Sequence, residues 1–434
     1  MKKMSRILAL CLCIMLTLSL FALSASAEEK PVLRVAASLS SAGEEASTLY
    51  VLSQAYMQSH PDIVLDVFTV DNTAYADKIK TMLSGGDQVD IFWPHTLPDY
   101  VSYINNEYAH ELNSFIEAEG MDLQETFHGV TDAITAEDGK LYAFPYSQHV
   151  WGIYYNKTMF DERGVEYPHN GMTWEEYAEL MEKMTFGEGS EKVYGGYFQD
   201  WENSFQSIGT MPGKHTLVEE NVDYASFLTY AYTLALDWQH RGIIMDFSNI
   251  QANNLSYHSL FINKNVASFY NGTWEIPNLI KAAENGDLTF EWGVCQPPYN
   301  DKEGGQAGNA NGAINMVCMS ANTKYPQEAY EFIKWIATSD EAAKILVDLG
   351  ETPINLTDEV IAAFTAKPGI PSNLADVYEK TTFILETPMA KDANTIQTIM
   401  NETNSLIMTE SMSIEDALNE ATQRVAEERA SEDY

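Results

Sequence analysis

The stretch IVLDVFTVDNTAYADKIKTMLSGGDQVDIFW, residues 63–93, combines two strand patterns with one helical pattern. Residues 63–70 are almost continuously apolar, which predicts a strand buried on both faces. Residues 74–83 have helical spacing, and Gly85-Gly86 favours the end of a helix at that point. Residues 89–93 form a second short apolar run. The stretch therefore predicts the succession strand, helix, strand.

A further strand and helix precede this stretch. Leu33, Val35 and Ala37 open a short strand, and residues 44–59 have the spacing of a helix that ends before Pro61. The N-terminal part thus has the order β-α-β-α-β. This order is typical of an α/β fold with a largely parallel sheet and right-handed crossovers.

The predicted topology indicates where a ligand binds. Ligands of open α/β sheets bind beyond the carboxyl ends of the strands, and these ends carry Ser38, Asn72 and the run Trp93–Thr96. None of them has a GxGxxG motif or a Walker lysine, so a nucleotide is not supported. No cluster of Arg or Lys lies there either, which disfavours a phosphorylated ligand.

The remainder of the chain continues with helical and strand patterns. Thr173-Trp174-Glu175-Glu176 is a capping box that begins a helix, and Pro326 suits a first helical position. The same reasoning predicts helices at 222–239, 340–348 (closed by Gly350) and 413–429, and strands at 152–155, 266–270, 292–295 and 314–319.

The composition excludes several classes of protein. The 434 residues carry 25 Lys+Arg against 63 Asp+Glu, a net charge of −38, and residues 28–434 carry 22 against 63, or −41. Such a chain repels nucleic-acid phosphate and anionic lipid, so we expect neither as a partner. With 45% hydrophobic residues the chain can bury a large core, and its length predicts two or three domains.

Residues 1–27 have the pattern of a signal peptide. A basic start is followed by the apolar run 7–23 and by the small residues Ala25-Ser26-Ala27, which predicts cleavage after Ala27 and secretion across the cytoplasmic membrane, to the periplasm or the cell surface. The alternative is a retained membrane anchor.

The four cysteines fall into two pairs. Cys11 and Cys13 each follow a leucine, whereas lipoprotein processing needs a small residue there, so a lipid anchor is not supported. Both are expected to leave with the signal peptide. Cys295 and Cys318 lie in apolar, strand-like runs, and a disulfide and two buried free thiols both remain open.

A series of motifs along the chain resembles one known family, the extracellular solute-binding proteins of ABC importers, in the family-1 group that includes maltose-binding protein. The similar segments, in chain order, are Leu83–Trp93, Asp138–Tyr146, Gly152–Phe160, Thr173–Glu176, Phe269–Trp274, Tyr325–Ile336 and Leu349–Pro353. They cover about residues 30–360. Their order and spacing carry the resemblance, since each motif alone is weak.

The resemblance implies two α/β lobes joined by crossing hinge strands, with a ligand in the interlobe cleft. On this basis residues 28–145 are the first part of the N-terminal lobe, and 146–310 form mainly the C-terminal lobe. Residues 311–365 return through the hinge with crossover helices, and 366–434 form a C-terminal helical segment. It also implies docking onto a membrane permease. We expect a monomer that binds a carbohydrate and delivers it unaltered, and the tandem aromatic positions favour an oligosaccharide.

Aromatic side chains are the first candidates for ligand contact, because planar rings cover the C–H faces of sugars. Trp93 ends a strand and Trp274 follows a strand and turn, and the resemblance places a stacking tryptophan at both positions. Trp201 has polar neighbours and no helical period, which suits a ligand-facing loop as well as a surface role. Trp151 favours the core.

Polar candidates lie near the same segments and can bind sugar hydroxyls. For most of them a role in forming a turn is an equal alternative. They are Ser38, Asn72, His95 and Thr96 near the strand ends, Tyr146 and Gln148 before the strand 152–155, Asn309 and Asn311 in the Gly-rich loop 304–312, and Glu351 before Thr352-Pro353.

Other functions remain as alternatives. A secreted glycosidase needs two carboxyls about 5 Å or 6.5–9.5 Å apart, and the sequence offers candidates but no motif. The pair Tyr154-Tyr155 raises ferric iron as a ligand, although strand packing explains it too, and the acidic balance favours a cation such as a polyamine. No catalytic triad or metal-ligand cluster is apparent, so we predict neither an enzyme nor a cofactor.

Overall fold

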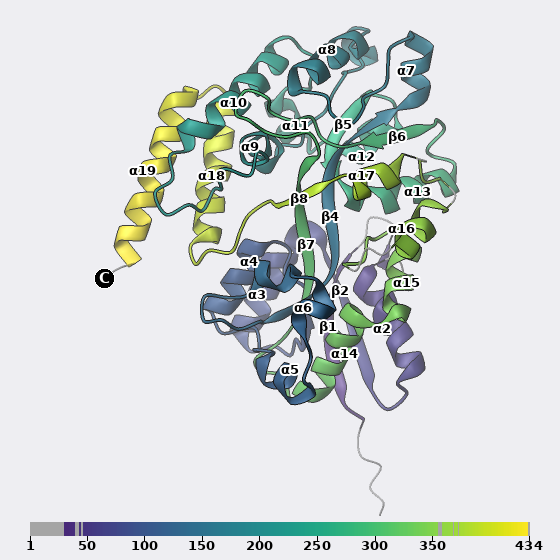
Figure 1. Ribbon diagram of the computed structural model, residues 1–434, viewed down its shortest axis with the longest axis vertical. Helices are drawn as coiled ribbons and strands as arrows, with labels where there is room; N and C mark the ends of the chain where they lie inside the picture. The colour runs from purple at the N-terminus through teal and green to yellow at the C-terminus, as the bar shows by residue number, and fades with distance from the viewer. Residues whose placement is uncertain are drawn as a thin grey trace, which may run out of the picture.

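The computed structural model describes residues 30–432 apart from 40–42, 45–46, 355–357, 368 and 372. The predicted signal peptide and Cys11 and Cys13 lie outside the described residues. The chain forms two lobes, one above the other, that are joined by long crossing strands (Figure 1). Within the described residues, no helix combines the length and apolar character needed to cross a membrane.

The first lobe is built on the predicted β-α-β-α-β unit. Strand β1 (Val32–Leu39) pairs in parallel with β2 (Val64–Asp71) and with β3 (Ile91–Phe92). The helices of this part are α2 (Thr48–Ser59), α3 (Tyr75–Gly85), α4 (Leu97–Asn105), α5 (Asn113–Glu119) and α6 (Leu123–Phe127).

The prediction that the second strand is buried on both faces is wrong. The sheet order is β2-β1-β3-β7-β4-β5, so β2 lies at an edge and pairs with β1 alone. Only Leu65 and Val70 of β2 are buried. An apolar run therefore does not by itself mean that both faces of a strand are buried, because apolar side chains are also common on partly exposed surfaces.

Two long strands connect the lobes. Strand β4 (Ala143–Asn156) runs antiparallel to β7 (Asn309–Met319), with pairs from Ala143–Cys318 to Val150–Gly312. At one end β7 pairs with β3, and at the other β4 pairs with β5 (Ser268–Gly272) and β6 (Trp292–Cys295). Both strands are longer than predicted. Tyr146 and Gln148 therefore lie inside β4, and Asn309 and Asn311 lie in β7 rather than in a loop.

The second lobe surrounds the far end of these strands with helices. Thr173 caps α8 through the predicted capping box with Glu176. The helices are α7 (Lys157–Arg163), α8 (Trp174–Met184), α9 (Asn203–Thr210), α10 (Tyr224–His240), α11 (Phe247–Asn253), α12 (Tyr257–Ile262) and α13 (Ile276–Asn285).

The C-terminal third of the chain visits both lobes. Helices α14 (Pro326–Thr338) and α15 (Asp340–Leu349) pack on the first lobe, and α18 (Ala393–Met408) and α19 (Ile414–Glu432) pack on α10 of the second (Figure 1). Between them lie α16 (Asp358–Thr365), α17 (Leu374–Glu379) and strand β8 (Thr382–Leu385), which pairs in parallel with β7. The sequence pattern did not predict β8.

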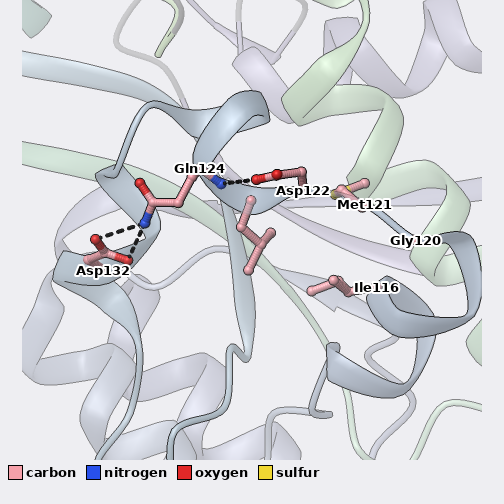
Figure 2. A pocket seen from close by; sticks show the side chains of 7 residues that line it. Ile116, Gly120, Met121, Asp122, Gln124 and Asp132 are labelled. Atoms are coloured by element: carbon pink, nitrogen blue, oxygen red, sulfur yellow. Dashed lines mark hydrogen bonds between the residues drawn. The ribbon is translucent and has the colours of Figure 1, made fainter.

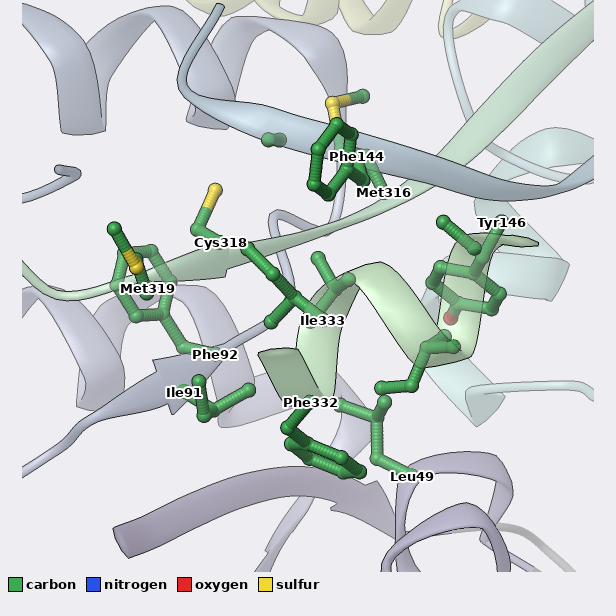
Figure 3. Packing of buried hydrophobic residues seen from close by; sticks show 14 of the residues in the cluster. Leu49, Ile91, Phe92, Phe144, Tyr146, Met316, Cys318, Met319, Phe332 and Ile333 are labelled. Carbon is green, nitrogen blue, oxygen red and sulfur yellow. The ribbon is translucent and has the colours of Figure 1, made fainter. Parts of the chain in front are cut away.

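Each lobe has its own hydrophobic core. In the first lobe, Phe92 of β3, Phe144 of β4, Cys318 of β7 and Phe332 of α14 are fully buried together (Figure 3). Cys295 lies in the core of the second lobe. Both thiols are buried and free, which settles the question that the sequence left open: they do not form a disulfide.

Candidate ligand-binding site

Trp93 follows directly after β3, and both its backbone and its ring contact Tyr75. The Tyr75 hydroxyl accepts a hydrogen bond from the backbone N–H of Trp93 at 3.1 Å and donates one to the Ala36 carbonyl at 2.9 Å, and the Tyr75 and Trp93 ring centroids lie 5.6 Å apart. Trp93 is half-buried as a residue, and its indole nitrogen is buried without a hydrogen-bond partner among the described residues. At the same carboxyl edge, Ser38 donates to the Asn72 amide oxygen at 2.7 Å.

His95 and Thr96 differ in what they do locally. The His95 ring lies 5.1 Å from the ring of Trp93, and burial lowers its pKa, so the imidazole is neutral near neutral pH. Thr96 is the N-cap of α4, because its hydroxyl accepts from the Asp99 N–H at 3.1 Å and donates to the Asp99 carboxylate at 3.0 Å. Thr96 therefore has a structural role in forming the helix.

A polar group at the crossing strands links the two lobes. Glu351 accepts from the Thr48 hydroxyl of α2 at 3.3 Å, and its other oxygen lies 3.4 Å from His149 Nε2 on β4. His149 Nδ1 lies 3.3 Å from the Thr273 hydroxyl, and its ring is 5.6 Å from that of Trp274. Burial lowers the pKa of His149, which the Glu351 carboxylate opposes. Glu351 is thus tied to both lobes.

Tyr146 and Gln148 flank this group on β4. Tyr146 is buried, and burial raises the pKa of its phenol, with the carboxylate of Glu351 and the phenol of Tyr75 adding to the rise. The backbone N–H of Gln148 donates to the Thr352 carbonyl at 3.0 Å. Tyr146 therefore lies within electrostatic range of Tyr75, which supports Trp93, and of Glu351, which adjoins His149.

Trp274 belongs to a cluster of aromatic rings in the second lobe. Its ring lies 5.2 Å from that of Trp151 and 6.3 Å from that of Trp201, which is 37% exposed. Tyr257 of α12 lies 6.0 Å from Trp201. Trp151 is fully buried, as predicted, and the more accessible rings of Trp201 and Trp274 pack around it. The structure therefore brings Trp201 and Trp274 together.

Gly272 makes room for the Trp274 ring. A Cβ atom at this position would lie 2.0 Å from Cζ3 of Trp274, so the indole lies directly over the glycine.

Carboxylates adjoin these rings, and the sequence did not single them out. The Trp151 indole N–H donates to Glu386 at 3.4 Å, and the Asn203 amide donates to the same carboxylate. Burial raises the pKa of Glu386 to about 7, the Glu202 carboxylate adds to the rise, and the Trp151 N–H opposes it. Burial also raises the pKa of Glu202. Glu386 follows strand β8, so its place beside Trp151 depends on a strand that the pattern did not reveal.

Asn309 and Asn311 bind elements of the second lobe. The Asn309 amide donates to the Met211 carbonyl, and the Asn311 amide donates to the Thr210 hydroxyl, both at 3.1 Å. They tie β7 to the end of α9. A cavity of about 210 Å³ lies beside this end, between Thr210–Thr216 and Phe383–Pro388.

A second, larger depression lies on the first lobe. It has a volume of about 630 Å³, and in it Gln124 donates to both carboxylate oxygens of Asp132 at 2.9 Å (Figure 2). It shares no residue with the surroundings of Trp93 or Trp274.

The tyrosine pair considered for iron is part of the protein interior. Tyr154 is fully buried, donates to the Gly272 carbonyl at 3.1 Å and stacks on Phe269. Tyr155 lies in a different hydrophobic cluster, because successive side chains of a strand point to opposite faces. The two phenols therefore do not face a common ligand. In the described part of the chain, no three His, Cys, Asp or Glu side chains gather as a metal site.

Comparison with known families identifies the class of protein. The model of the bacterial extracellular solute-binding protein family matches residues 52–372. The chain belongs to this family.

Particular relatives agree with this assignment. A curated multiple sugar-binding protein from Streptococcus mutans is 23% identical over 337 residues, covering 71% of this chain and 72% of the relative. A solved sugar transporter from Rhizobium etli, in an open conformation, is 30% identical with a TM-score of 0.74, covering 90% of this chain and 98% of that one. An ABC substrate-binding protein from Listeria monocytogenes, solved with cycloalternan, has a TM-score of 0.78 at 21% identity, covering 93% and 100%.

Proposed function

We propose that the protein binds a carbohydrate between its two lobes and delivers it, chemically unaltered, to the membrane permease of an ABC importer. The observation that carries this proposal is the placement of Trp93 and Trp274. Each is an incompletely buried tryptophan at or just after the end of a strand, one in each lobe, with the Trp93 ring against Tyr75 and the Trp274 ring against His149 of the hinge strand β4. Two such planes can cover the apolar faces of a sugar.

The roles of the other candidates follow from their surroundings. Trp201 is the most accessible ring of its cluster and extends the aromatic surface next to Trp274, which favours an oligosaccharide. Glu351 offers a carboxylate oxygen beside His149 as an acceptor for a sugar hydroxyl. We assign contacts with sugar hydroxyls to Ser38, Asn72, His95, Tyr146 and Gln148 as well; His95 adjoins the Trp93 ring, and Ser38 bonds to Asn72 at the carboxyl edge of the sheet. Thr96 contributes by capping α4, and Asn309 and Asn311 contribute by joining β7 to the end of α9.

The relatives support the same ligand class, since a multiple sugar-binding protein and a protein solved with cycloalternan share this fold. We propose that the protein acts as a monomer outside the cytoplasmic membrane after cleavage behind Ala27. We also propose that residues 28–145 and 146–310 are mainly the two lobes, with 311–365 returning through the hinge and 366–434 forming the C-terminal segment.

A ligand screen with mature protein tests the function. A ligand that binds only the folded protein raises the melting temperature, so we expect maltotriose, mannobiose, cycloalternan or another oligosaccharide to raise it and spermidine to leave it unchanged. Calorimetry on the hit should give lower affinity for W93A and W274A, by at least about 1 kcal/mol each. W335A is the matched control, because Trp335 packs on Tyr56 of α2 in the first lobe.

The same experiment separates a carrier from an enzyme. After prolonged incubation, product analysis should return the bound oligosaccharide intact. Cleaved sugar would establish the glycosidase alternative, and a response to spermidine alone would establish a cation carrier.

A further inference from the structure

A buried ion pair lies directly beside Trp274. Glu275 is the next residue in the chain, ends the short helical turn Thr273–Glu275, and has a fully buried side chain. One carboxylate oxygen accepts from His258 Nδ1 at 2.6 Å, and the other accepts from the Asn278 amide at 3.0 Å. A buried carboxylate without such partners would be strongly destabilising, so this turn depends on His258.

His258 belongs to α12, which meets the aromatic cluster at a second point. The preceding residue, Tyr257, packs its ring against Trp201 at 6.0 Å, and its hydroxyl lies beside the side chains of Asn271 and Trp274. Helix α12 therefore holds the segment around Trp274 from two sides, through a phenol and through an ion pair.

The charges of the pair support each other. The hydrogen bond to Glu275 raises the pKa of His258, burial opposes this rise, and the more distant Asp287 adds to it. Burial raises the pKa of Glu275, and His258 opposes that rise through its hydrogen bond and charge. Each charge favours the ionised form of its partner.

Trp274 follows Thr273, whose hydroxyl accepts a hydrogen bond from the backbone N–H of Val150 at 3.2 Å and lies 3.3 Å from His149 Nδ1. The Trp274 ring lies over Gly272, which has no side chain to hold it, and its neighbours Trp151 and His149 meet it edge to face. A change in the turn would carry the indole away from Gly272. Glu275 anchors the residue after Trp274, as Thr273 anchors the residue before it, so both fix the position of the indole.

We propose that the Glu275–His258 ion pair holds Trp274 in the orientation in which it contacts the carbohydrate, which makes His258 a positioning residue for ligand binding. This inference rests on the proposed function of Trp274. His258 itself packs behind the turn and acts on the ligand through the tryptophan.

The test compares H258Q with wild-type protein and with a matched control. H240Q carries the same substitution in the same lobe, where His240 Nε2 lies 2.8 Å from Glu410 on an exposed surface. The first readout needs no ligand: near-ultraviolet circular dichroism and tryptophan fluorescence report the environment of Trp274. We expect H258Q to change both spectra and H240Q to leave them unchanged. In a W274F background, H258Q should produce no such change.

The second readout is the affinity for maltotriose, measured by calorimetry. We expect H258Q to bind about tenfold more weakly and H240Q to bind as wild type. The losses from H258Q and W274F should not add, because both remove the same contact. If H258Q does not fold, E275Q replaces it, since this isosteric change removes the charge and keeps the shape.

The outcomes distinguish the two proposals. Unchanged tryptophan spectra in H258Q, or a loss of affinity that adds fully to that of W274F, would overturn the positioning role. If the spectra change as expected but wild-type protein binds neither maltotriose nor any other carbohydrate, the ion pair still fixes the orientation of Trp274, whereas the proposed function and with it the role in carbohydrate binding fail.

Discussion

Substitution of Gly272 by alanine tests whether the position of the Trp274 indole ring matters for ligand binding. The backbone at Gly272 has φ −83°, which any residue adopts, so alanine introduces no backbone strain. Its methyl group, however, would lie 2.0 Å from Cζ3 and 2.3 Å from Cε3 and Cη2 of Trp274. The substitution leaves every polar group in place and displaces only the ring.

The expected magnitude follows from this overlap. Carbon atoms in contact sit about 3.5–4.0 Å apart, so the ring must move by roughly 1.5 Å. Overpacking of this kind costs about 1–3 kcal/mol of unfolding free energy. Trp274 would also lose its edge-to-face contacts with Trp151 and His149. A misplaced ring forfeits an aromatic contact with the ligand of about 1 kcal/mol or more, which weakens binding roughly five- to tenfold.

Calorimetric titration with the carbohydrate identified in the screen measures this effect. G85A is the matched control, because a Cβ at Gly85 on α3 would meet no atom within 4 Å. G272A should approach the affinity of W274A, whereas G85A should bind as wild type. If G272A binds as tightly as wild type while remaining folded, Trp274 does not contact the ligand and the argument for its role is refuted.

Three further predictions concern stability and chemistry. The pKa of Glu386 is about 7 in the folded protein, above its ordinary value of 4.5 in the unfolded chain. The stability that the protonated carboxyl contributes is therefore fully present below the unfolded pKa and is lost as the pH rises through about 7. Urea unfolding should show wild-type stability falling between pH 5 and 8 by up to about 3 kcal/mol relative to E386Q, and parallel profiles would contradict the assignment. Because burial raises the pKa of both Cys295 and Cys318, native protein should resist alkylation until it unfolds, and its intact mass should not change with reductant; rapid labelling of native protein would be inconsistent with the structure. T173A should cost about 1 kcal/mol in urea unfolding, because it removes the cap that pairs with Glu176; an unchanged midpoint would speak against the capping box.

Local features of the fold were predictable because they depend on neighbouring residues. Helix α8 follows its predicted cap Thr173, and helix α14 begins at Pro326, as predicted. Gly350 ends α15 in the left-handed conformation, with φ 84°. The apolar periods between these signals located most strands to within a few residues. The tryptophan at the end of β3 follows from the same local reasoning.

Long-range pairing was not predictable from these patterns. Strand β8 is short and pairs with Asn309–Gly312 of β7, so its existence depends on a partner distant in the sequence. Glu386 reaches Trp151 only because this pairing brings it there. The position of β2 at the sheet edge has the same origin, since an apolar run records hydrophobicity and not the number of neighbouring strands.

The sequence alone thus determined the α/β class and the family, because these reside in local spacing and in motifs, and it proposed Trp93 and Trp274 as ligand contacts on the same basis. Tertiary structure alone decided that Cys295 and Cys318 remain thiols in separate cores and that His258 pairs with Glu275 beside Trp274. The physical reason is that hydrogen bonds and ion pairs act over a few ångströms of space, and only the folded chain sets which residues come within that distance.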